Sequence, residues 1–368
     1  MLFRSYQSEI GFASFYDTVP KAEAWLEART GEKPWFVFLH SYDTHRPYTK
    51  PGPWSHLYAK GQGSRVAEQI VAMSNLSELV VDGHYFPQLQ PNYFRHPSGE
   101  MILDPGTYDW IRNRIKDTDS LTVTDADKQH VRDHYDATLA YGDLLLGDFL
   151  ASMEDAGKLD NTIVIVLSDH GEDLLDHGFM NHRTGLYDSC THVPTIIAGP
   201  GFPKGSRVSG LIEARDIATT VLAAAGATIP AGLGGRDLRA VAAGTAPAID
   251  VVFSEGVMDM ISARTATHKL VYHHAPLNTP GYADTLAAAA LDDTHFTLYD
   301  LVADPTEQVN ILAKDPTTAA SLRDRMVAWR RTLTMGTHQL PQDQVDPAVA
   351  DQMRKNGYWE AGANETPH

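Results

Sequence analysis

The sequence predicts an α/β protein with a mostly parallel central sheet flanked by helices and a small C-terminal α+β subdomain. Two unbroken apolar runs, 35–39 and 163–167, lack the polar alternation of a half-exposed strand and are typical of strands buried on both faces. A long helical pattern directly precedes the second run, which gives a helix-to-strand unit. The chain has 368 residues, 43% of them hydrophobic, enough for one large domain and a smaller one.

The first elements are a helix over 14–30, ended by Thr30 and Gly31, and a strand over 35–39. This strand leads into a polar stretch, HSYDTHRPY, at 40–48. By itself such a stretch is either a loop whose His and Asp cap a turn or part of a site.

Residues 49–125 form a long irregular excursion, rich in proline and aromatic residues, with short helices expected near 65–80 and 107–117. Loops of this length in compact domains are often lids or specificity elements. Its aromatic side chains could line a substrate pocket, but local packing is the more common role of such residues. They are Trp54, Tyr58, Tyr85, Phe86, Tyr93 and Phe94.

Thr124 opens the long helix, because Asp127 stands three residues later as in a capping box, and Gly157 ends it. Apolar residues at helical spacing are expected to face the sheet. They are Tyr135, Leu139, Leu145, Leu146, Phe149 and Leu150.

The strand over 163–167 ends at Ser168, Asp169, His170 and Gly171. Ligands of open α/β sheets bind at the carboxyl ends of the strands, so this position favours a site. A carboxylate and an imidazole side by side, followed by His177, His182 and Arg183, are suited to a metal and an oxyanion. The alternative is an ordinary polar loop after a strand.

The remaining pattern predicts a strand over 193–198, a helix over 213–225 and a subdomain boundary near Gly244. The predicted domains are therefore 1–244, which includes the excursion, and 245–368. The second domain is expected to hold strands at 251–254, 260–265, 268–272 and 296–301 and a final helix over 317–334.

Several motifs in order resemble the sulfatase family of the alkaline phosphatase superfamily. They are the H-x-x-D-x-H-x-P-Y stretch at 40–48, a Y-x-A-x-x-x-Y-x-D helix, SDHGE, the run LYDSCTHVPTIIAGPG, a D-I-x-x-T-x-L helix, LYDL-x-x-DP, and a terminal MRKNGY at 353–358. The resemblance implies an alkaline-phosphatase-like fold, and a metal held by Asp169 and His170. It also implies sulfate contacts from His45 and Arg183. Calcium is the expected metal, with manganese or zinc as alternatives, because the classical animal arylsulfatases carry Asn where His170 stands whereas many bacterial relatives carry His.

Arg183 occupies the position where the family usually has a lysine. A guanidinium binds an oxyanion well but is a poor proton donor, so the role of acid shifts to His45 or His182. His177 follows in the same loop as a weaker candidate. The single cysteine, Cys190, is expected to be a packed thiol.

The resemblance covers the C-terminal two-thirds of a sulfatase. The family's nucleophile motif, C/S-x-P-x-R, does not occur in the sequence, and no pair of aspartates follows an apolar strand near residue 1. We therefore expect a truncated, inactive form of an enzyme that hydrolyses sulfate esters. One alternative is a phosphodiesterase or phosphonate monoester hydrolase of the same superfamily, which the G-x-x-D-x-x-x-x-V-P segment at 185–194 resembles. The other is a non-catalytic binding relative.

The composition and net charge limit the kinds of partner that the protein is expected to bind. A formal net charge of −17 argues against nucleic acid and anionic membranes, while a local cation still permits a small anionic sulfate or phosphate ester. One cysteine excludes an intramolecular disulfide. The sequence shows neither an export signal nor a membrane-length apolar run. Compartment and oligomeric state are not indicated.

Overall fold

The structure is a computed structural model, and it describes residues 14–29, 34–45, 48–50, 52–61, 63–72, 78–81, 84–86, 121–182, 185–256, 260–273, 282–293 and 295–333. Helices and sheets alternate along the chain, as the α/β class predicts. The predicted helix near 107–117 and the terminal motif at 353–358 lie outside these residues. None of the described helices has the length and apolar character needed to cross a membrane.

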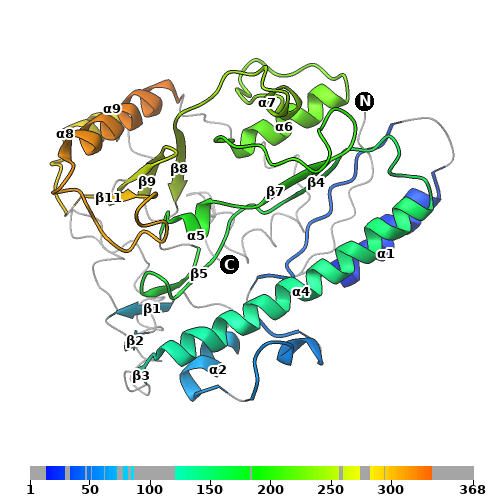
Figure 1. Cartoon of the computed structure of the whole chain (residues 1–368), viewed down its shortest axis with the longest axis horizontal. Coiled ribbons are helices and arrows are strands. Elements are labelled where there is room, and N and C mark those ends of the chain that lie inside the picture. The colour runs from blue at the N-terminus through cyan, green and yellow to red at the C-terminus, as the bar shows by residue number, and fades with distance from the viewer. Residues whose placement is uncertain are drawn as a thin grey trace, which may run out of the picture.

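The longest element is helix α4 (Asp125–Asp155), which crosses the molecule diagonally in Figure 1. The predicted capping box is present: the Thr124 hydroxyl accepts from the backbone N–H of Asp127, whose carboxylate accepts in return from the backbone N–H of Thr124. Gly157 takes a positive φ of 64° just beyond the helix. Helix α1 (Phe15–Glu27) packs beside α4, and α2 (Arg65–Ala72) contacts it as well.

One expectation for α4 is wrong. Leu139 was predicted to face the sheet, but its side chain is 52% exposed, while Phe149 and Met153 are buried against Leu26 of α1. The apolar stripe of a 31-residue helix serves different neighbours along its length, so a single face could not be read from spacing alone.

Strand β4 (Val164–Leu167) lies at the predicted position, but it is not buried on both faces as the sequence predicts. It pairs with β7 (Thr195–Ala198) in antiparallel register, Ile165 opposite Ile197, and among the described residues these two strands form a sheet by themselves. Residues 164–166 are only half-buried and Leu167 is exposed. Within the described residues of the connection between the strands, α5 (Asp188–Thr191) is the only helix and is too short for a crossover, and a strand without a crossover returns antiparallel.

The expected strand at 35–39 is not part of any described sheet. Its side chains alternate: Trp35, Val37 and Leu39 pack against α1 and α4, and Phe36 and Phe38 are exposed. The run is therefore covered on one face, whereas the sequence predicted burial on both.

Part of the long excursion forms a sheet with the segment that follows β4. Strands β1 (Glu78–Val81), β2 (His84–Phe86) and β3 (Leu121–Thr122) join β5 (Asp173–Leu174) and β6 (Phe179–Asn181) in the order β3-β2-β1-β6-β5. Because β1 pairs with β6, the excursion is tied to the loop that carries the candidate site. The described residues of the excursion also include a short 3-10 turn, η1 (Trp54–His56), and helix α2, which overlaps the helix predicted near 65–80.

The C-terminal part is an antiparallel sheet of β8 (Val252–Gly256), β9 (Met260–Arg264), β10 (His268–Tyr272) and β11 (Phe296–Asp300) in sequential order. The strands predicted at 260–265 and 268–272 are present and pair with each other as a hairpin. Helices α8 (Tyr282–Ala288) and α9 (Pro316–Thr332) cover one face of this sheet.

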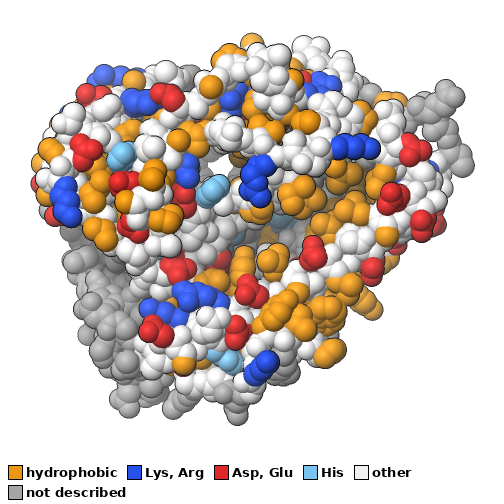
Figure 2. Space-filling view, viewed as in Figure 1, with side chains coloured by type: hydrophobic (Ala, Val, Ile, Leu, Met, Phe, Trp, Pro, Cys, Tyr) orange, Lys and Arg blue, Asp and Glu red, His pale blue; other side chains and the backbone are white. Residues whose placement is uncertain are grey.

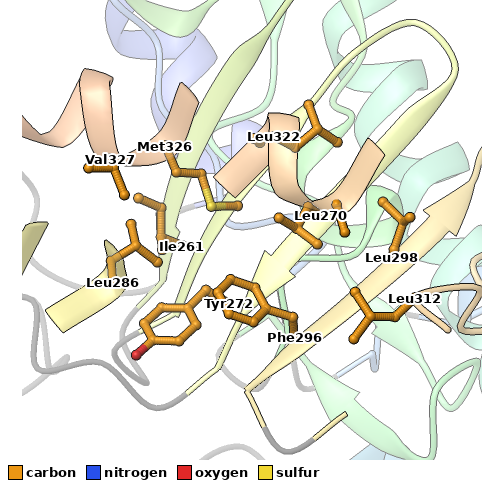
Figure 3. Close-up of a cluster of buried hydrophobic side chains, with 12 residues drawn as sticks. Ile261, Leu270, Tyr272, Leu286, Phe296, Leu298, Leu312, Leu322, Met326 and Val327 are labelled. Carbon is orange, nitrogen blue, oxygen red and sulfur yellow. The ribbon is translucent and has the colours of Figure 1, made fainter. Parts of the chain in front are cut away.

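Figure 3 shows the core between this sheet and its helices, where Met326 and Leu322 of α9 meet Ile261 and Leu270 of the strands. These four side chains are almost fully buried. Each contributes on the order of 1.5–3 kcal/mol by leaving water. This sheet thus has a core of its own.

Two helices complete the description, α6 (Ala214–Ala224) and α7 (Leu238–Ala242). Helix α6 falls within the predicted range 213–225. A buried ion pair joins α6 to the residues just before α7, since Arg236 donates to Asp216 at 2.7 Å. Gly244, at positive φ just after α7, remains the predicted subdomain boundary.

Candidate metal and oxyanion site

The candidate site starts where β4 ends, at Ser168–Glu172. Gly171 is held against the one-turn helix α5: its N–H donates to the carbonyl of Cys190 at 2.8 Å. A Cβ at this position would lie 2.0 Å from the carbonyl oxygen of Ser189, so only glycine fits. This close approach fixes the path of the backbone directly after Asp169 and His170.

Asp169 and His170 present one oxygen and one nitrogen to the same space. Asp169 Oδ2 lies 3.7 Å from His170 Nε2, and the Asp169 side chain is 60% exposed. His170 Nδ1 lies 2.9 Å from the carbonyl oxygen of Gly171, so this nitrogen carries the proton and donates it there. Nε2 is then the nitrogen with a lone pair, as in a metal-binding histidine whose other ring nitrogen is hydrogen-bonded.

His182 lies on this pair from the far end of the loop. Its ring stacks on that of His170 with centroids 3.7 Å apart. Its Nδ1 lies 3.1 Å from Oε1 of Glu172, whose side chain is only 5% exposed. Tyr48 donates its hydroxyl to the other carboxylate oxygen, Oε2, at 2.9 Å. Glu172 therefore orients His182 and directs Nε2 away from the carboxylate.

His45 reaches the same place from the 40–48 stretch. Its ring centroid is 5.9 Å from that of His182 and 5.6 Å from that of Tyr42. Asp43 anchors this turn: it accepts hydrogen bonds from the hydroxyls of Ser14 and Ser41. Burial alone would raise the pKa of Asp43, but these hydrogen bonds outweigh it and lower the pKa. Asp43 therefore supports the turn that carries His45.

His177 is not part of the imidazole group. Its Nδ1 pairs with Asp173, its Nε2 meets the carbonyl oxygen of Thr306 at 2.9 Å, and its ring stacks on Tyr187 at 3.5 Å. Desolvation would lower the pKa of His177, but the hydrogen bond to Asp173 raises it overall. These contacts indicate a structural role that ties the loop to residues after β11.

The loop is also tied to the C-terminal sheet through Asp188 of α5. Its carboxylate accepts from Arg264 and from the fully buried Lys269, each at 2.8 Å. Lys269 also pairs with Glu307 at 3.1 Å. Burial would raise the pKa of Asp188, but these cations lower it to about 2.

Cys190, in the same short helix, is buried as predicted, and burial raises the pKa of its thiol to about 12. A thiol that stays protonated at neutral pH is a poor nucleophile. It packs the helix that supports Gly171.

The structure thus brings together His45, Asp169, His170 and His182 from the predicted set. Arg183 lies outside the described residues, and its role remains a prediction. Sequence reasoning missed Glu172 and Tyr48 as site residues. Both stand within the quoted motifs, in SDHGE and at the end of HSYDTHRPY, but their burial and their contact across the chain are not visible in the sequence.

The donor atoms of Asp169 and His170 can be compared with what the expected metal requires. Asp169 Oδ2 and His170 Nε2 are close enough to bind one cation at the usual distances of about 2.0–2.5 Å, and carboxylate plus imidazole suits a divalent ion. Among the described residues no group of three or more His, Cys, Asp or Glu side chains is arranged to hold a metal. The two residues therefore fit as part of a coordination shell. The neighbouring imidazoles are placed to bind an anion or transfer a proton.

Comparison with protein families gives two matches. The sequence model of the sulfatase family matches residues 2–227. That of the N-sulphoglucosamine sulphohydrolase C-terminal region matches residues 175–332. Together they extend over most of the chain.

Curated relatives include arylsulfatase K of Xenopus laevis, 24% identical over 309 residues, which are 82% of this chain and 53% of the relative. Human arylsulfatase K is 25% identical, and the match covers 84% of this chain and 54% of the relative. The multifunctional alkaline phosphatase superfamily protein PehA of Trinickia caryophylli is 25% identical, with 85% and 60% covered. The chain spans about half the length of the arylsulfatase K relatives it matches.

Two solved structures share the fold. BT4656, solved with its substrate D-glucosamine-2-N,6-O-disulfate, gives a TM-score of 0.58 at 21% identity, covering 86% of this chain and 69% of the other. Phosphonate monoester hydrolase SpPMH from Silicibacter pomeroyi gives 0.57 at 22% identity, covering 86% and 59%. These likenesses confirm the predicted α/β fold class of the alkaline phosphatase superfamily.

Proposed function

The chain belongs to the sulfatase family, and we propose that its site binds sulfate esters and takes part in their hydrolysis to sulfate and an alcohol. The observation that carries the proposal is the convergence of three imidazoles with Asp169 at the end of β4, braced by the buried Glu172. The family implies a divalent metal. We propose Ca²⁺ in the first place, with Mn²⁺ or Zn²⁺ as alternatives.

In this proposal Asp169 and His170 hold the cation through Oδ2 and Nε2. When bound, the cation would neutralise charge on the sulfuryl oxygens. Arg183 is assigned to a second sulfuryl oxygen, because a guanidinium offers permanently charged donors in a fixed fork.

His182 and His45 are assigned to the departing alcohol. As an incoming oxygen nucleophile forms a bond to sulfur, the S–O bond to the alcohol breaks with its electron pair on the alcohol oxygen, and an imidazolium nitrogen supplies the proton that this oxygen gains. Glu172 keeps His182 protonated on Nδ1, so Nε2 is the atom that faces the ester.

The nucleophile of the family is missing from the 368 residues, since they contain no C/S-x-P-x-R. We therefore expect binding of the ester without multiple turnover.

A calorimetric titration with 4-nitrophenyl sulfate tests this function. We expect binding in the presence of Ca²⁺, loss of binding after the cation is chelated, and at least a tenfold weaker affinity in Arg183→Met. 4-Nitrophenol, which lacks the sulfate group, serves as control ligand and is expected not to compete. Binding that is unaffected by chelation and by Arg183→Met would refute the proposal.

A second function, hydrolysis of phosphonate monoesters, is favoured by the G-x-x-D-x-x-x-x-V-P segment at 185–194. The same titration with 4-nitrophenyl phenylphosphonate separates the two. A preference for this monoanionic phosphonate over the sulfate ester would support the second function.

A further inference from the structure

A cleft of about 670 Å³ lies beside the C-terminal sheet, at the turn of the β9–β10 hairpin. Three parts of the chain line it. They are the turn at 265–268, the first half of α9, and two stretches at 210–211 and 249–250 that precede α6 and β8. Small-molecule sites commonly have volumes of about 300–1,000 Å³ and lie between structural units. The cleft is therefore a candidate binding site.

This cleft lies on the other face of the C-terminal sheet from the candidate metal and oxyanion site. Successive side chains of a strand point to opposite faces of its sheet. In β10, Lys269 points toward α5, since it pairs with Asp188 there. Leu270 packs on α9, so His268, two residues before it, belongs to the α9 face and lines the cleft. A ligand in the cleft and an ester in the candidate site would thus occupy separate places.

Hydroxyl groups and an ion pair form the polar part of the lining. Helix α9 contributes the hydroxyls of Thr317, Thr318 and Ser321. Thr317, Ser321 and Arg325 follow one another at intervals of four residues, which places them on one side of the helix. Arg325 donates to Asp250, which also lines the cleft, at 2.5 Å. The polar side of the cleft therefore offers both donors and acceptors of hydrogen bonds.

Apolar side chains form the other part of the lining, and they are Leu211, Ile249 and Leu322. Leu322 also belongs to the core between the sheet and α9 that Figure 3 shows, so this wall is held in place. The described lining contains no Phe, Tyr or Trp, and a flat nucleobase or phenyl ring would have no such ring to stack on. The apolar wall suits the C–H groups of a ligand that is otherwise polar.

The charges around the cleft favour a neutral ligand. An anion at the start of α9 would meet Asp315, whose carboxylate already caps the helix by accepting from the N–H of Thr318 at 3.0 Å. An anion would also meet Asp250, and a cation would meet Arg325. Figure 2 shows acidic and basic side chains interspersed over the region where Figure 1 draws α8 and α9. This part of the surface therefore has no field of one sign that would attract an ion.

We propose that the cleft binds a neutral mono- or disaccharide. Sugar hydroxyls both donate and accept, as do the hydroxyls that α9 presents, and the Arg325–Asp250 pair adds a charged donor and a charged acceptor. The C–H groups of the sugar ring pack on Leu211 and Ile249. The cleft would bind such a ligand whether or not the candidate site hydrolyses esters.

Amide chemical shifts of the 368-residue chain, followed in titrations with neutral disaccharides, test the proposal. The probes are lactose, cellobiose and N,N′-diacetylchitobiose, which differ in stereochemistry and substituents. We expect saturable shifts at 210–211, 265–268 and 317–325 with at least one probe, and no shifts at 168–172. Inorganic sulfate at the same concentration is expected to leave the residues of the cleft unshifted.

Two substitutions on α9 are expected to weaken binding at least tenfold each. Ser321→Leu fills the cleft with an apolar side chain that suits a helix, and Arg325→Met removes the charged donor. The matched controls lie on the same helix outside the cleft. Thr332→Leu replaces another exposed hydroxyl of α9, and Arg331→Met breaks the exposed ion pair with Asp284. Both controls are expected to bind as the wild type does.

Three results would overturn the proposal. One is the absence of saturable shifts with all of the disaccharides. Another is a larger response to sulfate than to the disaccharides, which would make the cleft an anion site. The third is binding that Ser321→Leu and Arg325→Met leave unchanged. Because Ser321 is exposed, Ser321→Leu is expected to keep the thermal midpoint of the wild type, so that a loss of binding in this variant reports on the cleft and not on unfolding.

Discussion

At the scale of single residues, the buried carboxylate of Glu172 connects the two stretches that build the site. It accepts from Tyr48 on one oxygen and meets His182 on the other. His182 in turn stacks on His170, so the orientation of two imidazoles depends on one carboxylate. A carboxylate buried to this degree is stable only when hydrogen-bonded on both sides.

Glu172→Gln keeps the shape of the side chain and removes its charge. We expect the free energy of unfolding to fall by on the order of 1–3 kcal/mol, the usual cost of weakening a hydrogen bond to a buried charged group. The ring nitrogens of His182 are also expected to change their NMR shifts. Urea denaturation and nitrogen-detected NMR measure the two effects. Glu154→Gln, on the exposed end of α4, is the control, and equal effects of both variants would contradict this role.

Asp188 gives the protein a specific acid sensitivity. Its pKa is lowered from 3.8 to about 2 because burial, which would raise it, is outweighed by Arg264 and Lys269. The stabilisation is therefore fully present above pH about 4 and is lost as the pH falls through about 2. Its size is about 2 kcal/mol at about 1.4 kcal/mol per pKa unit.

Denaturation curves between pH 5 and 2 test this dependence. We expect the stability of the wild type to fall more steeply with acid than that of Asp188→Asn, by about 2 kcal/mol over the range. Identical slopes would show that Asp188 does not titrate with a lowered pKa.

At the scale of elements, helix α5 links the loop after β4 to the C-terminal sheet. Its Asp188 forms ion pairs with Arg264 of β9 and Lys269 of β10. In the same helix the carbonyl of Cys190 accepts a hydrogen bond from the N–H of Gly171. A displacement of α5 would thus reach the residues next to Asp169. The C-terminal sheet supports the site without contributing to it directly.

Lys269→Met tests this link. It removes an ammonium that is 0% exposed and leaves Glu307, 1% exposed, with an uncompensated charge. We expect a loss of about 3–5 kcal/mol in urea denaturation. The additional change Glu307→Gln is expected to restore part of it. Arg331→Met breaks an ion pair whose partners are 58% and 79% exposed and should cost less than about 1 kcal/mol. Similar losses in the two single variants would contradict the link.

The same scale shows what the sequence could predict. The capping box at Thr124, the strands at 260–265 and 268–272 and helix α9 depend on neighbouring residues and were predicted within a few positions. The burial of 35–39 and of 163–167 depends on which strands lie beside them. Their composition indicates interior strands, but the described chain covers each run on one side at most.

The candidate site was likewise predicted from the sequence only in part. Asp169 and His170 were predicted from their place at the end of an apolar run, and His45 from a motif. The structure brings the rings of both His45 and His170 next to that of His182. Glu172 and Tyr48 were missed because their importance lies in a contact across 124 positions of sequence. No local pattern encodes such a contact.

At the scale of the whole molecule, the candidate site combines two stretches that lie far apart in the sequence, the turn at 40–48 and the loop after β4. Within the described residues the two proposed metal donors, Asp169 and His170, are fewer than the four or more ligands that a divalent ion takes. The 368-residue chain is therefore expected to bind a metal weakly.

The most direct test of the central claim, that the end of β4 is half of a metal site, is a titration of the 368-residue chain with Mn²⁺ followed by water-proton relaxation, with Ca²⁺ as competitor. The account predicts a weak site displaced by Ca²⁺ and paramagnetic broadening of the ring signals of His170 and His182. It also predicts at least tenfold weaker binding in Asp169→Asn, but not in the control Asp143→Asn on the exposed side of α4. Binding that is the same in wild type and Asp169→Asn, or no binding at all, would contradict it.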